Sequence, residues 1–103
     1  MIYEVLIAAE AEQDLRRIYE YICLELKSPK SAKKQINSLE AAINSLTELP
    51  FRHRVFEHEP WKSRGLRIFP VGNYLVFYIV DKSSRLVNIV RIMYGKRDIK
   101  KHL

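Results

Sequence analysis

The sequence predicts a single α+β domain in which an N-terminal strand and an antiparallel helical hairpin pack on a small antiparallel sheet, in the order β-α-α-β-β-β. Three observations support this fold class. The chain has 103 residues, enough for one core of two packed layers. Two stretches with helical spacing of apolar residues follow a short β-favouring run, and three more β-favouring runs follow Gly65. We therefore expect residues 1–103 to form one domain.

The first predicted strand and helix lie at the N-terminus. Tyr3 to Ile7 is a short apolar run with β-favouring residues, and the helical pattern extends from about Glu10 to Lys27. Acidic residues in the first turns complement the helix dipole, but no capping residue stands beside Ala9, so the sequence does not fix the first residue of the helix. The apolar stripe consists of Leu15, Ile18, Tyr19, Ile22 and Leu26.

The second predicted helix has a clearer start, because Ser28 can cap it and Pro29 suits its first position. Its apolar pattern continues to about Glu48, and a turn at Lys27–Pro29 makes the two helices an antiparallel hairpin. Residues 51–64 follow neither period and predict a long loop, which favours a functional or partner contact. We expect Trp61 to pin this loop to the core.

Three strands are predicted in the C-terminal half, at Leu66–Pro70, Tyr74–Val80 and Leu86–Tyr94. The segments 71–73 and 81–84 between them are good hairpin connections. In the second and third strands, the odd-numbered and the even-numbered positions are both mostly apolar, so both faces of these strands are apolar. One face of the sheet should therefore pack under the helices, while the other needs cover from aromatic rings, a loop or a partner.

Charge divides the chain into two unequal halves. Residues 1–50 have a net charge of −2 and residues 51–103 a net charge of +8. A positive field on the C-terminal half suits a surface that meets phosphates or an acidic protein.

The lone Cys23 cannot form an internal disulfide, and no segment has the length of a membrane span or a secretory signal. We expect a cytoplasmic protein without membrane contact, and neither His53 nor His58 has the spacing of a metal site.

Four basic residues stand out near or within the predicted sheet. Arg67 and Arg91 each interrupt an apolar strand, and Lys96 and Arg97 follow the last strand. A guanidinium in such a row either pairs with an acid or faces an incoming phosphate or carboxylate. For Arg91, either Asp14 or Asp98 could be the internal partner, so both readings stay open for Arg67 and Arg91. Lys96 and Arg97 are expected to face a target.

Several short sequence words occur in a consistent order on these predicted elements. They are AEAEQDLRRI on the first helix, SPKSA at the start of the second, GLR and GNYLVFY in the first two strands of the meander, and VNIVRIMYGKRD at the end. Over essentially the whole chain this pattern resembles the RelE/ParE toxin superfamily of bacterial type II toxin-antitoxin modules. The resemblance implies a small cytoplasmic toxin, bound and blocked by a cognate antitoxin in a hetero-oligomer, with roles in growth inhibition and plasmid stabilization.

The resemblance implies one of two activities, between which fold cannot choose. RelE-type members are ribosome-dependent endoribonucleases that cut messenger RNA, whereas ParE-type members bind DNA gyrase and are not themselves enzymes. Nuclease members usually have an arginine after the tyrosine of the G-x-Y word, where this chain has Leu75. RelE lysines align with Leu66 and Ile68, and the terminal tyrosine of RelE aligns near His102 or Leu103. These differences weaken nuclease chemistry, which needs positioned polar groups.

Other residues keep the nuclease alternative open. Arg97 matches a basic position of RelE, and Tyr94 stands where related nucleases place a terminal acid or base. The V-F-Y word and the terminal R-I-x-[HY]-x-x-R-D pattern look more like the ParE branch, although Tyr94 stands where histidine is commoner. The predicted activity is gyrase inhibition, and the alternative is a ribosome-dependent mRNA interferase; neither needs a cofactor or a metal. A third reading is a nucleic-acid-binding module with Tyr74 or Tyr78 as stacking platforms, or an inactivated toxin. The predicted target-binding residues are Arg67, Arg91, Tyr94, Lys96 and Arg97, and the nuclease site would use Arg67, Tyr94, Lys96, Arg97 and His102.

Overall fold

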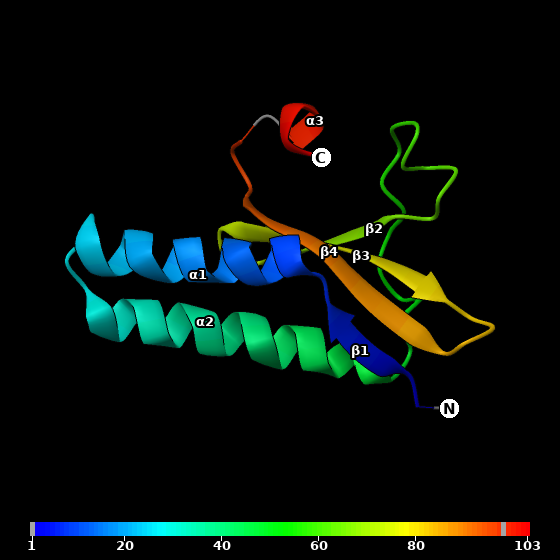
Figure 1. Ribbon diagram of the computed structural model, residues 1–103, viewed down its shortest axis with the longest axis horizontal. Helices are drawn as coiled ribbons and strands as arrows, with labels where there is room; N and C mark the ends of the chain where they lie inside the picture. The colour runs from blue at the N-terminus through cyan, green and yellow to red at the C-terminus, as the bar shows by residue number, and fades with distance from the viewer. Residues whose placement is uncertain (1, 98) are drawn as a thin grey trace.

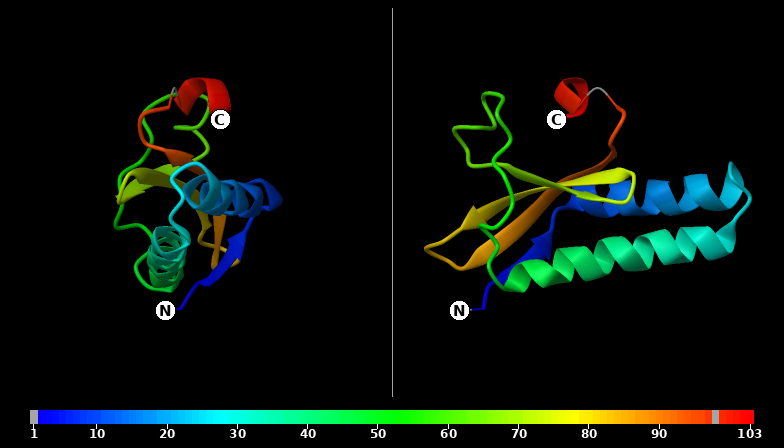
Figure 2. Two further views of the ribbon diagram at one scale, coloured as in Figure 1. Left: turned by 90° about the vertical axis from the view of Figure 1, so that its left-hand side faces the viewer. Right: turned by 180° about the vertical axis from the view of Figure 1, so that it is seen from behind.

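The structure, a computed structural model, describes residues 2–97 and 99–103. A four-stranded sheet forms one layer and an antiparallel helical hairpin covers one of its faces (Figure 1; Figure 2). The predicted order of elements is confirmed, with two short helices added. The elements are β1 (Glu4–Ile7), α1 (Ala9–Leu24), α2 (Pro29–Asn44), the 3₁₀ turn η1 (Ser45–Thr47), β2 (Arg67–Val71), β3 (Tyr74–Asp81), β4 (Leu86–Tyr94) and α3 (Ile99–His102).

The sheet is mixed rather than wholly antiparallel, which corrects part of the predicted fold. Its strand order is β1-β4-β3-β2; β2, β3 and β4 form the predicted antiparallel meander, and β1 pairs in parallel with β4. The cause is visible in Figure 1, where the two helices return the chain to the end of the sheet at which β1 begins. Strand β2 then runs in the direction of β1, β3 runs back, and β4 again follows β1.

The helical hairpin is tighter than the apolar pattern predicts. Helix α1 ends at Leu24 instead of about Lys27, because the chain turns at Lys27, where φ is 50°, and the Ser28 N–H bonds to the Ile22 carbonyl at 3.2 Å. Ser28 caps α2 as predicted, since its Oγ accepts a bond from the Ser31 N–H at 3.4 Å. Helix α2 ends at Asn44 and continues as η1, where the predicted helix ran on to Glu48.

Each face of the sheet has its own apolar cluster. The first lies between the sheet and the hairpin, and its buried members include Leu39 and Ile43 of α2 and Val76 and Tyr78 of β3. The second covers the opposite face, where the long loop and the C-terminus supply the predicted cover. It consists of Phe56, Leu66, Ile68, Phe77 and Met93, with Trp61, Leu75, Ile79, Val90, Ile99 and Leu103 packed against it. Trp61 thus ties the loop to this second cluster, as predicted.

Two local features shape the meander. Gly72 has a φ of 59° in the two-residue turn between β2 and β3, a conformation that suits glycine. The register of β3 with β4 shifts between Phe77 and Tyr78, which leaves Val90 without an opposite residue. Such a bulge bends a strand and redirects the side chains that follow it, here Arg91.

In the part of the chain that is described, no helix combines the length and the apolar character needed to cross a bilayer.

Candidate functional site

The helical hairpin extends past the end of the sheet at which β4 finishes and β3 begins (Figure 1). A groove of about 810 Å³ lies there, which we call the hairpin groove. Its floor is apolar, with Ile18 and Ile22 of α1 and Ile92 of β4, and its rim is polar and aromatic. The other lining residues are Asp14, Arg17, Tyr21, Leu26, Ser31, Gln35, Asn73, Tyr74, Tyr94 and Arg97. Helix, turn and strand ends far apart in sequence therefore build one concave surface.

Three tyrosines give the hairpin groove its aromatic character. Tyr74 opens β3 and Tyr94 closes β4; they are paired in register, and their rings meet edge to face with centroids 5.9 Å apart. Tyr74 is buried, and burial, followed by the nearby Tyr21 and Tyr94, raises the pKa of its phenol. Its hydroxyl therefore stays protonated near neutral pH and can donate or accept a hydrogen bond. Tyr21 and Tyr94 are 54% and 40% exposed, so both rings are available to a partner.

Two arginines line this groove. Arg97 lies in the turn after β4, where its backbone N–H bonds to the Tyr94 carbonyl at 3.1 Å, and its side chain is exposed. Arg17 reaches the groove from α1. Lys96 is exposed in the same turn as Arg97 but does not line the groove. Of the predicted target-binding residues, the structure brings Tyr94 and Arg97 together here.

Arg91 is held inside the molecule. Its Nε and Nη2 donate to the two carboxylate oxygens of Asp14 at 2.7 and 3.1 Å, and its Nη1 donates to the His102 carbonyl at 2.6 Å. Asp14 also accepts a bond from the Ile92 N–H at 2.9 Å. The bond to Asp14 raises the pKa of Arg91. The internal pairing with Asp14 that the sequence allowed is therefore confirmed; the alternative partner, Asp98, lies outside the described residues.

Arg67 lies at the start of β2, away from the groove. Its Nη1 donates to the carbonyls of Phe51 and His53 at 3.2 and 2.6 Å, and its guanidinium stands 5.1 Å from the centre of the Phe51 ring. In the sheet register Arg67 is opposite Tyr78, whereas Tyr94 is opposite Tyr74. Four residues along a strand span about 13 Å. Arg67 therefore anchors the start of the long loop and lies far from the groove.

The predicted nuclease residues are consequently only partly together: Tyr94 and Arg97 line the groove, whereas Arg67 and His102 do not. His102 has an exposed side chain on α3 and does not line the groove. Leu75, which stands where nuclease members usually have an arginine, packs into the second apolar cluster on the opposite face. Among the described residues that line the groove, the single carboxylate, Asp14, is committed to Arg91 and the Ile92 N–H, and no histidine is present. The groove can bind anions and aromatic or apolar groups, but it offers no evident general base.

Sequence reasoning missed Arg17 and Tyr21. They are four residues apart on α1, so they share one face of the helix, and they project beside the predicted Tyr94 and Arg97. The spacing of four residues between an arginine and a tyrosine on one helix is a signal for a shared binding face. The sequence does not show that this face lies beside Tyr94 and Arg97, because the register of the hairpin against the sheet is not readable from either helix alone. In the described chain, no three or more His, Cys, Asp or Glu side chains gather as they would around a metal ion.

Comparison with family models gives one match, to the ParE toxin of the type II toxin-antitoxin system parDE, over residues 5–99. The comparison with curated proteins gave no match.

Among solved structures, the chain is similar to one from the chromosomal ParDE system of P. aeruginosa, with a TM-score of 0.75 and 18% identity over 92% of this chain and 98% of that chain. It is also similar to a chain of the RelBE2 toxin-antitoxin complex of Mycobacterium tuberculosis, with a TM-score of 0.63, 21% identity, and 91% and 99% of the two chains covered. A chain of the archaeal RelE-RelB complex of Pyrococcus horikoshii OT3 gives a TM-score of 0.65 and 19% identity, covering 94% and 99%. At these identities the structural likeness supports the fold.

Proposed function

Because the chain belongs to the ParE toxin family of type II toxin-antitoxin systems, we propose that it arrests growth by binding DNA gyrase through the hairpin groove and the adjoining turn that contains Lys96 and Arg97. The observation that carries this proposal is the separation of Arg67 and His102 from Tyr94 and Arg97. Arg67 is bonded to loop carbonyls at the start of β2, and the groove contributes cations and rings without a free base. That composition suits recognition of a protein surface more than cleavage of a phosphodiester.

The residues we assign to the target surface are Tyr94, Arg97, Arg17 and Tyr21, with Lys96 at its edge. Tyrosine and arginine contribute most strongly to protein interfaces, since each offers a large contact area and directional hydrogen bonds. Arg67 and Arg91 support the surface indirectly, by fixing the long loop and by joining α1 to β4. Neither is proposed to touch the target.

The test compares two assays with purified components. In the first, the protein is added to gyrase with relaxed plasmid; in the second, to ribosomes programmed with messenger RNA. We expect loss of supercoiling and intact messages. Ribosome-dependent cleavage without any effect on supercoiling would refute the gyrase proposal.

Arg97→Ala is the sharpest variant for this site. Removing one charge-assisted hydrogen bond of about 1.5 to 3 kcal/mol should raise the concentration needed for half-inhibition of gyrase by about tenfold or more. The matched control is Lys82→Ala, which removes an exposed charge from the turn after β3. The Arg97 variant should keep its thermal transition, because in the structure its side chain is exposed. A collapse of that transition would instead assign Arg97 a structural role.

A ribosome-dependent mRNA interferase is the second candidate, and one observation favours it. Tyr94 and Arg97, both in the predicted nuclease set, lie together on the groove. If the second assay shows cleavage, Tyr94→Phe should abolish it while leaving the fold intact, because the phenol would be the proton-transfer group.

We also infer that a cognate antitoxin binds this chain in the cytoplasm. The ParDE system of P. aeruginosa and the complexes of M. tuberculosis and P. horikoshii pair chains of this fold with antitoxins. Co-expression of the neighbouring reading frame should restore growth and co-purify with the chain. Failure of every adjacent small protein to do so would count against this inference.

A further inference from the structure

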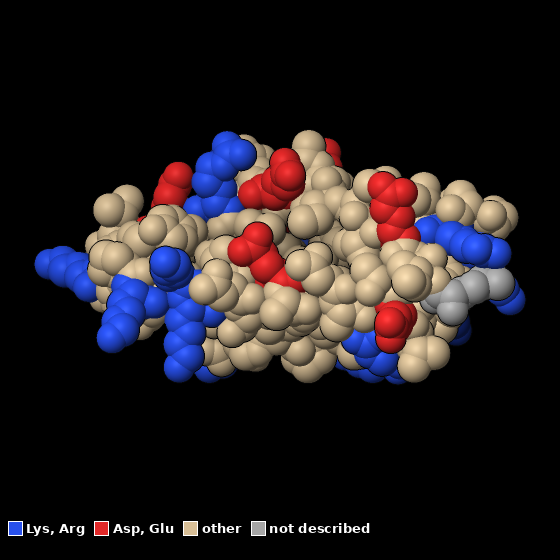
Figure 3. All heavy atoms as spheres, turned by 90° about the horizontal axis from the view of Figure 1, so that it is seen from below, with Lys and Arg blue, Asp and Glu red and all other residues tan. Residues whose placement is uncertain are grey.

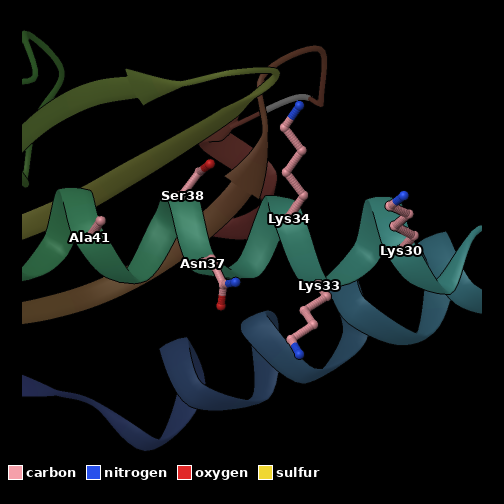
Figure 4. A pocket seen from close by; sticks show the side chains of 6 residues that line it. All are labelled: Lys30, Lys33, Lys34, Asn37, Ser38 and Ala41. Atoms are coloured by element: carbon pink, nitrogen blue, oxygen red, sulfur yellow. The ribbon is translucent and has the colours of Figure 1, made fainter.

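The outward side of α2 carries a row of lysines that the proposed function does not use. Lys30, Lys33 and Lys34 are all exposed, and with Asn37, Ser38 and Ala41 they line a shallow hollow of about 460 Å³ (Figure 4). We call these six residues the lysine face. At 100° per residue its three lysines fall within an arc of about 100° around the helix axis. Helix α2 presents Ser31 and Gln35, rather than these lysines, to the hairpin groove.

The lysine face is not neutralised within the described structure. No acidic residue occurs between Leu26 and Leu39. The salt bridges found among the described residues join Lys62 to Glu57 and Arg91 to Asp14, so they leave these lysines aside. Seen from the α2 side, Lys and Arg atoms gather at the end of the molecule that holds the helical turn (Figure 3). This concentration arises within the half of the sequence whose net charge is negative.

The placement of these lysines opposes helix stability. Cations near a helix N-terminus interact unfavourably with the helix dipole, and like charges three or four residues apart repel each other. Lys30 stands next to Pro29 at the start of α2, and Lys33 and Lys34 follow at those two spacings. Helix α1, in contrast, has Glu10 and Glu12 in its first turn, whereas α2 has no acid there. A local arrangement that lowers stability is characteristic of a surface kept for binding.

We propose that the lysine face binds the phosphate backbone of duplex DNA. Lysine ammonium groups on flexible stems contact phosphates as point charges without reading bases. Lys30 and Lys34 are one turn apart, about 6 Å along the axis, so the row can follow one DNA strand. The face contains no aromatic ring on which an unpaired base could stack, which favours a duplex over a single strand. This binding goes beyond the proposed gyrase inhibition and uses a different surface.

The experiment measures binding of the purified full-length chain to a fluorescent duplex of about 20 base pairs, by anisotropy, at salt concentrations from roughly 50 to 200 mM. The test variant is Lys30→Gln/Lys33→Gln/Lys34→Gln. The control variant, Lys62→Gln/Lys82→Gln/Lys101→Gln, removes the same charge from exposed positions elsewhere. Three phosphate contacts contribute about −2.7 to the slope of log K against log salt. We expect the test variant to lose most of that slope and of its low-salt affinity, and the control to retain both.

Several outcomes would overturn the proposal. Equal losses in the two variants would show that net charge alone drives binding. Equally tight binding of single-stranded DNA would contradict the proposed preference for duplex DNA. Unchanged duplex binding with lost binding to phosphatidylserine vesicles would assign the face to a membrane. The thermal transition of the test variant should stay or rise, because repulsion along α2 is relieved. A marked fall would make the lysines structural and contradict the argument from instability.

Discussion

Arg67 and Arg91 look alike in the sequence, since each is a single guanidinium in an apolar strand, but each has its own partners in the fold. Arg91 forms a two-bond pair with Asp14, a carboxylate that is 6% exposed, and Arg67 bonds to two carbonyls of the long loop. A buried charge is stable only when its hydrogen bonds are satisfied. The two arginines therefore stabilise the scaffold around the groove: Arg67 fixes the long loop, and Arg91 joins β4 to α1.

Replacing Asp14 by alanine tests this bracing role. The change removes three hydrogen bonds and leaves the Arg91 guanidinium without its carboxylate. Loss of one partner from a buried pair costs about 3 to 5 kcal/mol, and the partial exposure of Arg91 lowers the expected loss to roughly 2 to 4 kcal/mol. Urea unfolding measures it, with Glu12→Ala on the exposed side of α1 as the control. Equal effects of the two variants would contradict the proposed stabilisation of the fold by the Asp14–Arg91 pair.

His53 predicts a dependence of stability on pH. Its ring stacks on Phe69 with centroids 4.2 Å apart, and its Nε2 is buried without a partner among the described residues. Burial, then the charges of Arg52 and Arg67, lower the pKa of this imidazole. The folded protein therefore binds a proton less readily than the unfolded chain. Stability should be constant above the unfolded pKa near 6.5 and decrease as the pH falls below it, until the folded pKa is reached.

The variant His53→Phe should flatten that decrease, because phenylalanine keeps the stacked ring and cannot be protonated. Thermal unfolding between about pH 7 and pH 5 measures the difference. His58→Gln is the control, since it removes an exposed imidazole from the same loop. A profile that persists in His53→Phe would place the titration elsewhere.

At the scale of elements, most of the secondary structure was predictable from the sequence. The Ser28-Pro29 start of α2 and the bounds of β4 were predicted correctly, because capping chemistry and β-branched runs act locally. The parallel pairing of β1 and the fold-back of α3 were not predicted. Both depend on contacts between residues far apart in the chain, and the four residues of α3 are too few for a periodic signal.

The contribution of α3 can be measured by removing its two apolar contacts. Ile99 and Leu103 pack against the second cluster. The double variant Ile99→Ser/Leu103→Ser should lose roughly 1 to 3 kcal/mol, less than two fully buried side chains would cost, because both are only half-buried. Denaturant unfolding gives the value, and Lys101→Ser on the same helix is the control. An unchanged stability would show that α3 does not contribute to the cover.

At the scale of the whole molecule, the site was only partly predictable. Arg97 was identified because it directly follows the last strand, and Tyr94, the final residue of that strand, was identified from the family resemblance. Arg67 was grouped with them although the register puts it about 13 Å away along the strands. Arg17 and Tyr21 were missed because their distance to β4 is set by how α1 packs on the sheet. A site assembled from α1, α2, β3 and β4 becomes visible only when the packing of these elements is known.

Coverage of both sheet faces predicts where the molecule opens first. Strands β3 and β4 occupy the centre of the sheet and contribute to both apolar clusters, so their amides exchange only on global unfolding. Helix α3 has one turn, and Ile99 and Leu103 anchor it in the second cluster. Native-state hydrogen exchange should therefore show Leu103 exchanging at a much lower opening free energy than Val76 or Tyr78. Equal protection of Leu103 and Val76 would mean that the cover and the sheet unfold as one unit, and that the second face is never exposed in the native ensemble.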